Sequence, residues 1–397
     1  MTVPITFPLE DMRAALQEDN LDGWLLYDFR GSNAIARNIV QMPHGKIATR
    51  RWFYFIHSKL NPVKLVHAIE HENLDHLPGQ TIVFRSWQDL HAALSKALNG
   101  CTRIAMEYSP EDDIPYVSLV DAGVIELVRK CGVEIVSSGD LVQLFEARWD
   151  ADQSRSHFEA ARLVNEFKDE GFRFIGENIR AGRPITEYDV QQHMWSLFEP
   201  SNMYANDAPI VAVNANASNP HYLPTAEKNT PVRKGDLVLI DIWGKLRQPR
   251  AIYGDITWMG YAGHQVPERF EEIFQIVRGA QQSAFELITR DFQNAKTTFG
   301  WQADQAARDY IAQAGYGDYF YHRTGHNIGQ EVHGNGAHLD NLETRDNRKL
   351  IPNTGFSIEP GIYLPEFGVR SEVDCYISEK GPVITSPRQE KILALLA

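Results

Sequence analysis

The sequence predicts a two-domain protein of the α+β class. At 397 residues the chain is too long for one compact hydrophobic core, so we expect two domains. Strand-like and helix-like segments alternate over residues 1–150, which favours a small α/β domain with a mixed sheet. From residue 151 onward, long segments with helical spacing accompany strongly apolar strand-like segments. We therefore assign residues 151–397 to a second domain.

The elements of the first domain follow from its hydrophobic pattern. Residues 9–18 predict a short amphipathic helix, ended by Asn20 and Gly23, and residues 87–98 predict another helix. Apolar runs predict strands at residues 24–29, 52–57, 63–69, 81–85, 103–107 and 133–137. This domain shows no phosphate-binding glycine motif and no cluster of metal-ligand residues. We expect it to serve as a scaffold, a subunit contact or the wall of a cleft.

The second domain begins with a long helix over residues 152–180, where apolar residues recur at near-helical spacing. Thr186 and Asp189 resemble a capping box for the helix that follows. A strand at 210–213 precedes a polar loop, 214–220, which leads to His221. Pro267 opens a further helix, and residues 303–314 predict the last one.

Residues 235–261 form the stretch on which the second domain is organised. They predict two apolar strands in one hairpin, with Asp241 embedded in the first strand and Asp255 in the second. A carboxylate in a buried strand is costly unless it is paired or bound to metal. Each acid alone is readily explained by pairing with a nearby Lys or Arg, but two acids in one hairpin can reach a single point.

Two acids near the carboxyl terminus repeat this pattern. Glu359 and Glu372 are set in apolar strand-like segments flanked by Gly and Pro, and His326 lies between glycines, where backbone can approach closely. A lone His in such a loop is more often a structural hydrogen-bonding residue than a ligand. Taken with the hairpin, however, two Asp, two Glu and one His suit a pair of divalent first-row ions better than one structural zinc. Such a pair lowers the pKa of a bridging water and polarises a carbonyl, which indicates hydrolysis of an acyl bond.

Composition excludes several other classes. A net charge of −13 disfavours nucleic acid and anionic membranes as partners, and no apolar run is long enough to cross a bilayer. Three widely spaced cysteines fit a reducing cytoplasm, and the amino terminus shows no apparent signal peptide. We expect a cytoplasmic protein.

Several motifs in order resemble one known family. HRTGHNIG at 322–329, EVHG at 331–334, SIEPGIYLPEFGVRSE at 357–372 and GDIT at 254–257 resemble the metallopeptidases of the pita-bread fold. The similarity is to the branch of Xaa-Pro dipeptidases (prolidases) and Xaa-Pro aminopeptidases. It covers the whole chain: residues 151–397 resemble the pita-bread catalytic domain, and residues 1–150 resemble the creatinase-type amino-terminal domain.

The resemblance implies a role for each of the five candidate metal ligands. Asp241 would bind one ion, His326 and Glu359 would bind the second, and Asp255 and Glu372 would bridge both. Glu359 would also accept a proton from the attacking water. Manganese is the expected metal, with cobalt, zinc and iron as alternatives that the same ligands accept.

The resemblance also implies residues that handle the substrate. His221, His322 and His333 match histidines that orient the substrate and stabilise the tetrahedral intermediate. Arg370 matches an arginine that faces the substrate's carboxyl-terminal carboxylate, and pairing with a neighbouring acid is an equally weighted alternative.

The chain departs from the family pattern near the hairpin. Trp243 follows the first ligand, the loop at 245–250 is longer than usual, and Trp258 stands where an arginine is expected. Asn327 and Gly334 are further departures, and none removes a ligand. Trp243, the 245–250 loop and Trp258 lie near the metal strands, so they bear on substrate identity.

Three functions remain open at this point. The first is hydrolysis of the Xaa-Pro bond in dipeptides or short peptides by a metal-bridging hydroxide, with dipeptidase favoured over aminopeptidase. The second is a non-peptidase enzyme on the same fold, either a creatinase-like C–N hydrolase or a metal-dependent lyase. The third, a non-catalytic binding protein, is disfavoured because all five ligands are present. A homodimer is the expectation from the family.

Overall fold

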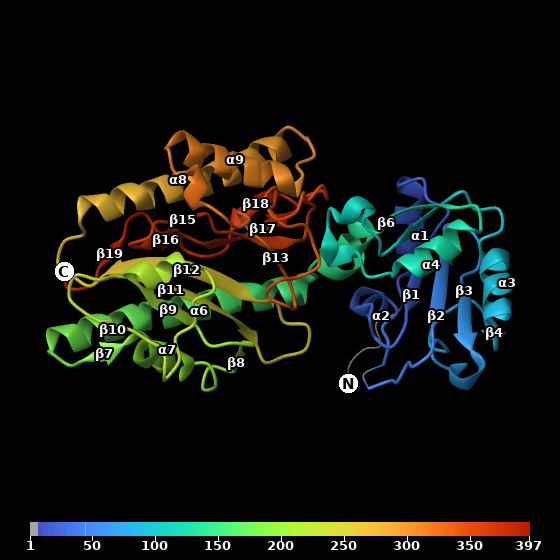
Figure 1. Cartoon of the computed structure of the whole chain (residues 1–397), viewed down its shortest axis with the longest axis horizontal. Helices are drawn as coiled ribbons and strands as arrows, with labels where there is room; N and C mark the ends of the chain where they lie inside the picture. Colours follow the sequence, from blue (N-terminus) through green and yellow to red (C-terminus); the bar gives the residue numbers. More distant parts are fainter. Residues whose placement is uncertain (1–6, 44) are drawn as a thin grey trace. The chain divides into compact units, whose positions relative to one another are not determined.

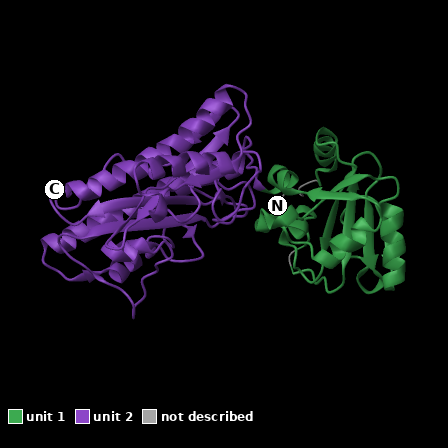
Figure 2. Cartoon of the chain, turned by 45° about the horizontal axis from the view of Figure 1, so that its top comes forward, with its two compact units in different colours: residues 1–146 green, residues 147–397 purple. Residues whose placement is uncertain are grey.

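The computed structural model of the protein describes residues 7–43 and 45–397 (Figure 1). The chain divides into two compact units, Met1–Glu146 and Ala147–Ala397 (Figure 2). This division lies close to the expected domain boundary, and the assignment of the two units as functional domains stays a prediction. The amino-terminal stretch that shows no apparent signal peptide includes residues 1–6, which lie outside the described residues.

The first unit contains a six-stranded sheet in the order β4-β3-β2-β1-β5-β6. Only β2 runs antiparallel to its neighbours in this sheet, so the sheet is mixed, as the alternating pattern predicts. The strands are β1 (Gly23–Asp28), β2 (Trp52–His57), β3 (Val63–His67), β4 (Gln80–Phe84), β5 (Arg103–Met106) and β6 (Glu134–Ser137). The helices are α1 (Leu9–Glu18), α2 (Ala34–Ile39), α3 (Trp87–Ala97), α4 (Ala122–Arg129) and α5 (Gly139–Val142).

Alternating side chains of the central strands fill a separate apolar cluster on each face of this sheet. Trp24 and Leu26 belong to one cluster, and Leu25 and Tyr27 belong to the other. The strand predicted at 63–69 is too long: it ends at His67, whose Nδ1 accepts a hydrogen bond from Ile69 N at 3.2 Å and turns the chain.

The second unit is layered, with two pairs of helices enclosing the sheets (Figure 1). On one side lie α6 (Ala151–Arg180) and α7 (Glu187–Trp195), and on the other lie α8 (Glu268–Gln293) and α9 (Gly300–Gln313). One sheet holds β8 (Met203–Tyr204), β9 (Ile210–Val213), β11 (Leu237–Leu246), β12 (Gly254–Tyr261) and β19 (Leu393–Ala394). Another holds β13 (Asn327–Ile328), β14 (Gly355–Ile358), β17 (Val373–Ser378) and β18 (Gly381–Ile384). Two-stranded pairs are formed by β7 (Ile185–Thr186) with β10 (Pro231–Val232), and by β15 (Gly361–Tyr363) with β16 (Gly368–Arg370).

The helices of this unit start close to where the sequence places them. Asp150 caps α6, accepting from Gln153 N at 2.9 Å, and the predicted capping box of Thr186 and Asp189 opens α7. Helix α9 begins at Gly300, ahead of the predicted residue 303, because the side chain of Gln302 accepts from Phe299 N at 2.9 Å and satisfies its first turn.

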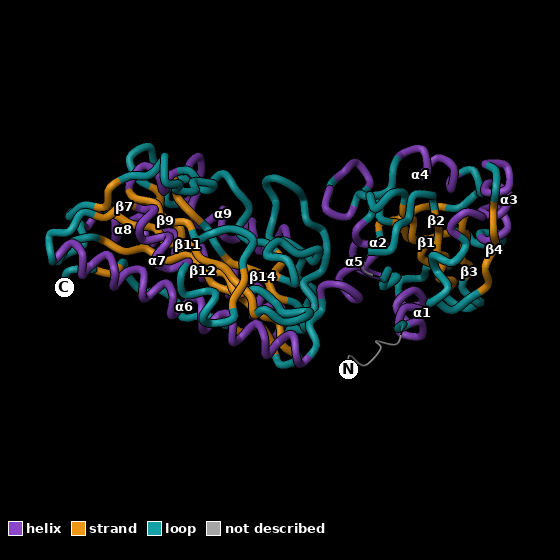
Figure 3. Tube along the Cα trace, turned by 90° about the horizontal axis from the view of Figure 1, so that it is seen from below, coloured by secondary structure: helices purple, strands orange, loops and turns teal. Residues whose placement is uncertain are grey.

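The β11–β12 hairpin separates two apolar clusters of the second unit. Val238 and Ile256 face the cluster that contains α6 and α7, whereas Leu239 and Met259 face the cluster that contains α8 and α9. Helix α6 runs along the hairpin (Figure 3), and it comes so close at Gly254 that a Cβ there would lie 2.7 Å from Ala161 N. No helix within residues 7–43 and 45–397 combines the length and apolar character required to cross a membrane.

Gly325 is required by a similarly close contact between two backbones. A Cβ at this position would lie 1.9 Å from the carbonyl oxygen of Ser357, so any larger residue must push the His326 loop away from β14. We predict that Gly325→Ala lowers the free energy of unfolding by about 1–3 kcal/mol, as overpacking typically does. Urea denaturation measures this effect. The control is Gly329→Ala, because the nearest atom to a Cβ there is 3.8 Å away. Equal stability of the two variants would contradict the packing argument.

Candidate active site

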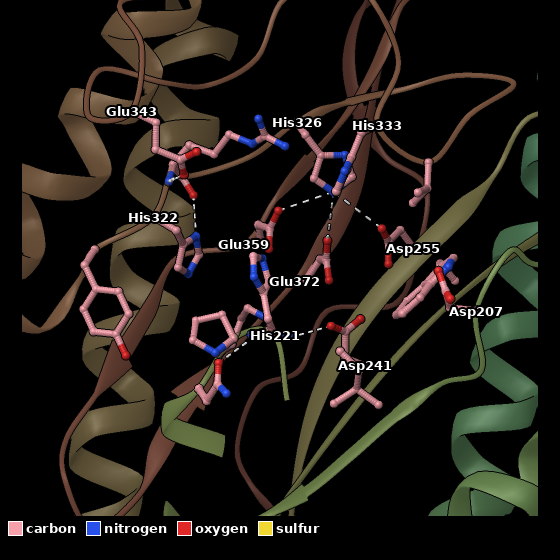
Figure 4. A pocket seen from close by; sticks show the side chains of 18 of the residues that line it. Asp207, His221, Asp241, Asp255, His322, His326, His333, Glu343, Glu359 and Glu372 are labelled. Carbon is pink, nitrogen blue, oxygen red and sulfur yellow. Dashed lines mark hydrogen bonds and ion pairs between the residues drawn. The ribbon is translucent and has the colours of Figure 1, made fainter. Parts of the chain in front are cut away.

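All nine predicted site residues line one cavity of about 620 Å³ in the second unit (Figure 4). They come from distant parts of the chain: His221, Asp241, Asp255, His322, His326, His333, Glu359, Arg370 and Glu372. The polar loop, the hairpin, the glycine-rich loop and the strands after it therefore meet at a single place, as the hairpin acids led us to expect.

A histidine and three carboxylates form the centre of this cavity. The Nε2 atom of His326 lies 3.4 Å from Glu359 Oε1, 3.5 Å from Asp255 Oδ2 and 3.9 Å from Glu372 Oε1 (Figure 4). One ligand atom each from Asp255, His326 and Glu372 all lie within 4.8 Å of one another. The fifth predicted ligand, Asp241, lies across the hairpin in the same cavity.

Strand pairing brings these side chains together. In the β14–β17 ladder Ile358 pairs with Val373, so Glu359 and Glu372 come at adjacent ends of neighbouring strands. The amide of Glu372 donates to the carbonyl of Thr257 at 3.1 Å, which ties this end to the hairpin two residues from Asp255. The backbone of His326 is tied to β14, because its amide donates to Ser357 Oγ at 3.0 Å.

The electrostatics of the centre favour a bound cation. Burial, followed by repulsion from neighbouring acids, raises the pKa of Asp255 and of Glu372 well above their usual values. Burial also raises the pKa of Glu359 to about 7. Asp255 Oδ1 is buried and accepts no hydrogen bond from the residues described. A carboxylate oxygen in this situation is costly, and a divalent ion would satisfy it, so these residues fit a metal site.

Arg370 pairs with Asp241. Pairing with an oppositely charged neighbour is the alternative that the sequence left open for each of these two residues. Arg370 Nη2 donates to Asp241 Oδ2 at 2.5 Å, its Nε to Thr257 Oγ1 at 3.1 Å, and its Nη1 to the Tyr363 hydroxyl at 3.2 Å. The guanidinium is almost entirely buried. Burial raises the pKa of Asp241, and the positive charge of Arg370 opposes this rise.

His322 is held in one tautomer. Its Nδ1 lies 2.7 Å from the carbonyl oxygen of Arg323, which can only accept, so Nδ1 carries the proton. Its Nε2 lies 2.6 Å from the Tyr363 hydroxyl and accepts from it. Burial and the nearby charge of Arg370 lower the pKa of His322 to about 3, so the ring is neutral near pH 7. Both nitrogens are thus engaged within the protein.

The other two histidines lie at the more open part of the cavity. The ring of His333 meets that of His326 edge-on, with centroids 4.3 Å apart. Burial of part of the ring lowers the pKa of His333 to about 4, and the residue as a whole is exposed to solvent. His221 is exposed on its loop, where its amide donates to Asn219 Oδ1 at 3.1 Å.

The two unusual tryptophans have different surroundings. Trp243 lines the cavity and pairs directly with Asp255 across the hairpin. The expectation that Trp258 lies near the substrate is wrong. It alternates to the opposite face of β12 from Asp255 and Thr257, where Lys168 Nζ lies 3.5 Å from its ring centroid. The cations of the 245–250 loop bind protein groups; Arg250, for example, pairs with Asp150 at 2.9 Å.

Sequence reasoning missed several lining or supporting residues. Thr257 donates from its hydroxyl to Glu372 Oε2 at 2.7 Å, and it shares its strand face with Asp255, so strand alternation could have identified it. Tyr363, which joins His322 to Arg370, lies in the GIY segment but carries no signal of its own. Asp207 and Glu343 also line the cavity and belong to unremarkable polar loops.

A buried group of carboxylates and histidines in a cavity of this fold defines a candidate metal-dependent hydrolase. Residues 159–379 match the metallopeptidase family M24, and the chain belongs to this family. The chain is 31% identical over 264 residues to the uncharacterized peptidase YqhT of Bacillus subtilis, covering 66% of this chain and 68% of that protein. It is 36% identical over 199 residues to an Xaa-Pro dipeptidase of Lactobacillus helveticus, covering 49% of this chain and 48% of that protein. The aligned part thus spans about half the length of this second relative.

Solved structures agree on the fold. The dipeptidase PepE of Mycobacterium ulcerans superposes with a TM-score of 0.69 at 20% identity, covering 98% of this chain and 96% of that one. A prolidase from Thermococcus sibiricus gives a TM-score of 0.62 at 20% identity, covering 99% of this chain and 100% of that one. The predicted α+β architecture with a pita-bread domain is confirmed.

We predict that His322 stays neutral and in its Nδ1–H tautomer well below pH 6.5. Its folded pKa lies near 3 and its unfolded pKa near 6.5, so the unfolded chain binds the extra proton between these values. This histidine therefore contributes stability that is lost as the pH falls below about 6.5. In NMR spectra of histidine-labelled protein, we expect the imidazole signals of His322 to remain those of the Nδ1–H tautomer from pH 8 to pH 5. His322→Gln assigns the signals. A titration with a midpoint near 6.5 would overturn the assigned hydrogen bonds.

Proposed function

We propose that this protein hydrolyses the Xaa-Pro bond of dipeptides with two divalent metal ions. Five side chains would hold the ions: Asp241, Asp255, His326, Glu359 and Glu372. The observation that carries the proposal is the meeting of one histidine with three buried carboxylates, one of which keeps an oxygen without a hydrogen bond within the described residues. When bound, such ions lower the pKa of a water molecule and polarise a carbonyl oxygen.

Glu359 is the residue suited to accept the proton of the attacking water. Its side chain is mostly buried and faces the cavity, and a raised pKa near 7 suits a group that must take up and release a proton near neutral pH. The Ser357 hydroxyl, 3.2 Å from Glu359 Oε1, holds this carboxylate in orientation.

His221 and His333 are the candidates for direct contact with the substrate. Both are exposed residues that line the cavity, and an imidazole N–H there can donate to the oxygen of a tetrahedral intermediate. The sequence assigns the same role to His322. Because both of its nitrogens are engaged, we propose instead that His322 positions Tyr363, and through it Arg370.

Arg370 is the group best placed to meet the carboxylate of a dipeptide. It is a buried guanidinium whose only acidic hydrogen-bond partner within the described chain is Asp241, one of the proposed metal ligands. Cations bound by Asp241 would compete for that carboxylate and leave the arginine fork available to an incoming one. The curated relatives named Xaa-Pro dipeptidase support this choice.

Other properties stay predictions. Manganese is the first metal to test, with cobalt, zinc and iron as alternatives. A homodimer and a cytoplasmic location follow from the family resemblance and from composition.

The proposal predicts which of two matched peptides is cleaved. The manganese-loaded protein should hydrolyse Met-Pro and leave Met-Pro-Ala intact, and a chelator should abolish the activity. Glu372→Gln, which removes a proposed bridging carboxylate, should lower kcat/KM at least about a hundredfold, because even indirect support of a metal ligand is worth 10- to 100-fold. Circular dichroism checks that the variant is folded.

Each alternative result has a defined meaning. Preferential cleavage of the tripeptide would make the enzyme an aminopeptidase, and full activity of metal-loaded Glu372→Gln would contradict the bridging role. Inactivity on both peptides would contradict the Xaa-Pro activity and favour a non-peptidase reaction on this fold.

A further inference from the structure

Two carboxylates of the cavity, Asp207 and Glu343, have no part in the proposed metal centre. Asp207 is exposed at the rim, in the loop that leads into β9, and it lines the same cavity as the acid cluster. Figure 4 shows it beside Asp241 and Asp255, with Glu343 and His322 on the opposite side of the cluster.

Hydrogen bonds fix Asp207 relative to the hairpin. The side-chain amide of Asn206 donates to Asp207 Oδ2 at 2.8 Å, and Trp243 Nε1 donates to Asn206 Oδ1 at 3.1 Å. Trp243 pairs with Asp255 across the hairpin. A continuous chain of contacts therefore runs from the proposed metal ligand to the indole, and from the indole to the carboxylate at the rim.

Asp207 has no cationic partner within the described residues, since it takes part in none of the ion pairs found there. Lys245, a lysine of the hairpin, donates to the carbonyl of Gln330. On the other side of the cluster, Glu343 accepts from the amide of Arg323 at 3.1 Å, whereas Arg370 binds the hairpin at Asp241 and Thr257. The cavity thus has Arg323 on one side, Arg370 at the Asp241–Thr257 pair of the hairpin, and an uncompensated acid linked to the indole of the Trp243–Asp255 pair.

We propose that Asp207 and Trp243 select peptides whose amino-terminal residue has a cationic side chain, lysine or arginine. This inference rests on the proposed function. If Arg370 binds the carboxyl end of the dipeptide beside the Asp241–Thr257 pair, the amino-terminal residue extends along the hairpin to the Trp243–Asp255 pair. There a carboxylate offers a charge-assisted hydrogen bond, and an indole offers a cation–π contact.

The position of Asp207 at the rim indicates that it binds the side chain of the substrate's amino-terminal residue and not the α-ammonium group. The α-nitrogen is separated from the scissile carbonyl carbon by only two bonds, so it must lie at the level of the buried cluster. Asp207 is exposed, and two residues of chain separate it from Ile210, which pairs with Asp241. A rim position of this kind is reached by a long side chain.

The test compares kcat/KM for Lys-Pro and Met-Pro, two dipeptides of similar side-chain length that differ in charge. Four metal-loaded proteins are measured: the wild type, Asp207→Asn, Asp207→Glu and Glu343→Gln. The last variant removes the same charge from the opposite side of the cavity. It controls for the general negative field of the cavity.

The wild type should prefer Lys-Pro. Asp207→Asn should reduce the ratio of kcat/KM for Lys-Pro to that for Met-Pro about tenfold. This effect lies between that of an exposed ion pair and that of a hydrogen bond to a charged group. The loss should lie mainly in KM for Lys-Pro, because the contact is the same in ground and transition states. Asp207→Glu should restore most of the ratio, and Glu343→Gln should leave it unchanged.

An equal loss for both dipeptides in Asp207→Asn, or an equal change of the ratio in Glu343→Gln, would overturn the proposal. A wild type that cleaves Met-Pro well without preferring Lys-Pro would also overturn it and leave the proposed function standing. Cleavage of neither dipeptide would show that the proposed function itself is wrong, and the inference would fall with it.

Discussion

Three carboxylates and a histidine share one buried point in the second unit, and a fourth carboxylate lies beside them in a pair with arginine. Charges of one sign at this depth repel one another and lose their hydration, which raises the pKa values of Asp255, Glu359 and Glu372. A cluster of this kind is unfavourable for folding unless positive charge is present. Much of the surrounding structure holds these acids in place against that repulsion.

The supporting contacts come mainly from backbone groups and small polar side chains. Asp374 accepts from the amide of Asp255 at 2.9 Å, Thr257 binds Glu372, and Ser357 joins His326 to Glu359. The two sheets meet where Glu372 N donates to Thr257 O. At Gly254 and Gly325 the backbone lies so close to neighbouring backbone that there is no room for a side chain. These close contacts hold the adjacent residues, Asp255 and His326, in place. A fixed geometry of this type prepares the ligands before an ion arrives.

Much of this arrangement could be predicted from sequence because its signals are local. Asp241 and Asp255 stand out as acids in apolar strands, and the capping box at Thr186 marks its helix directly. The pairing of Arg370 with Asp241 was open, because it depends on the approach of residues 129 positions apart. The error at Trp258 has a simple cause: nearness along the chain was taken as nearness to the site, although alternate residues of a strand face opposite ways. Asp207 and Tyr363 had no local signal, since their roles arise only from the folded cavity.

The most direct test of the account is a calorimetric titration of chelator-treated protein with Mn²⁺ near pH 7, in two buffers of different ionisation enthalpy. Binding should release protons, because metal displaces them from carboxyl groups whose pKa values are raised. We expect about two ions per chain, held by the four carboxylates and one histidine of the cluster, and an observed enthalpy that depends on the buffer. Absence of binding, or binding that is unchanged in Asp255→Asn, would contradict the claim that this acid cluster is a metal centre.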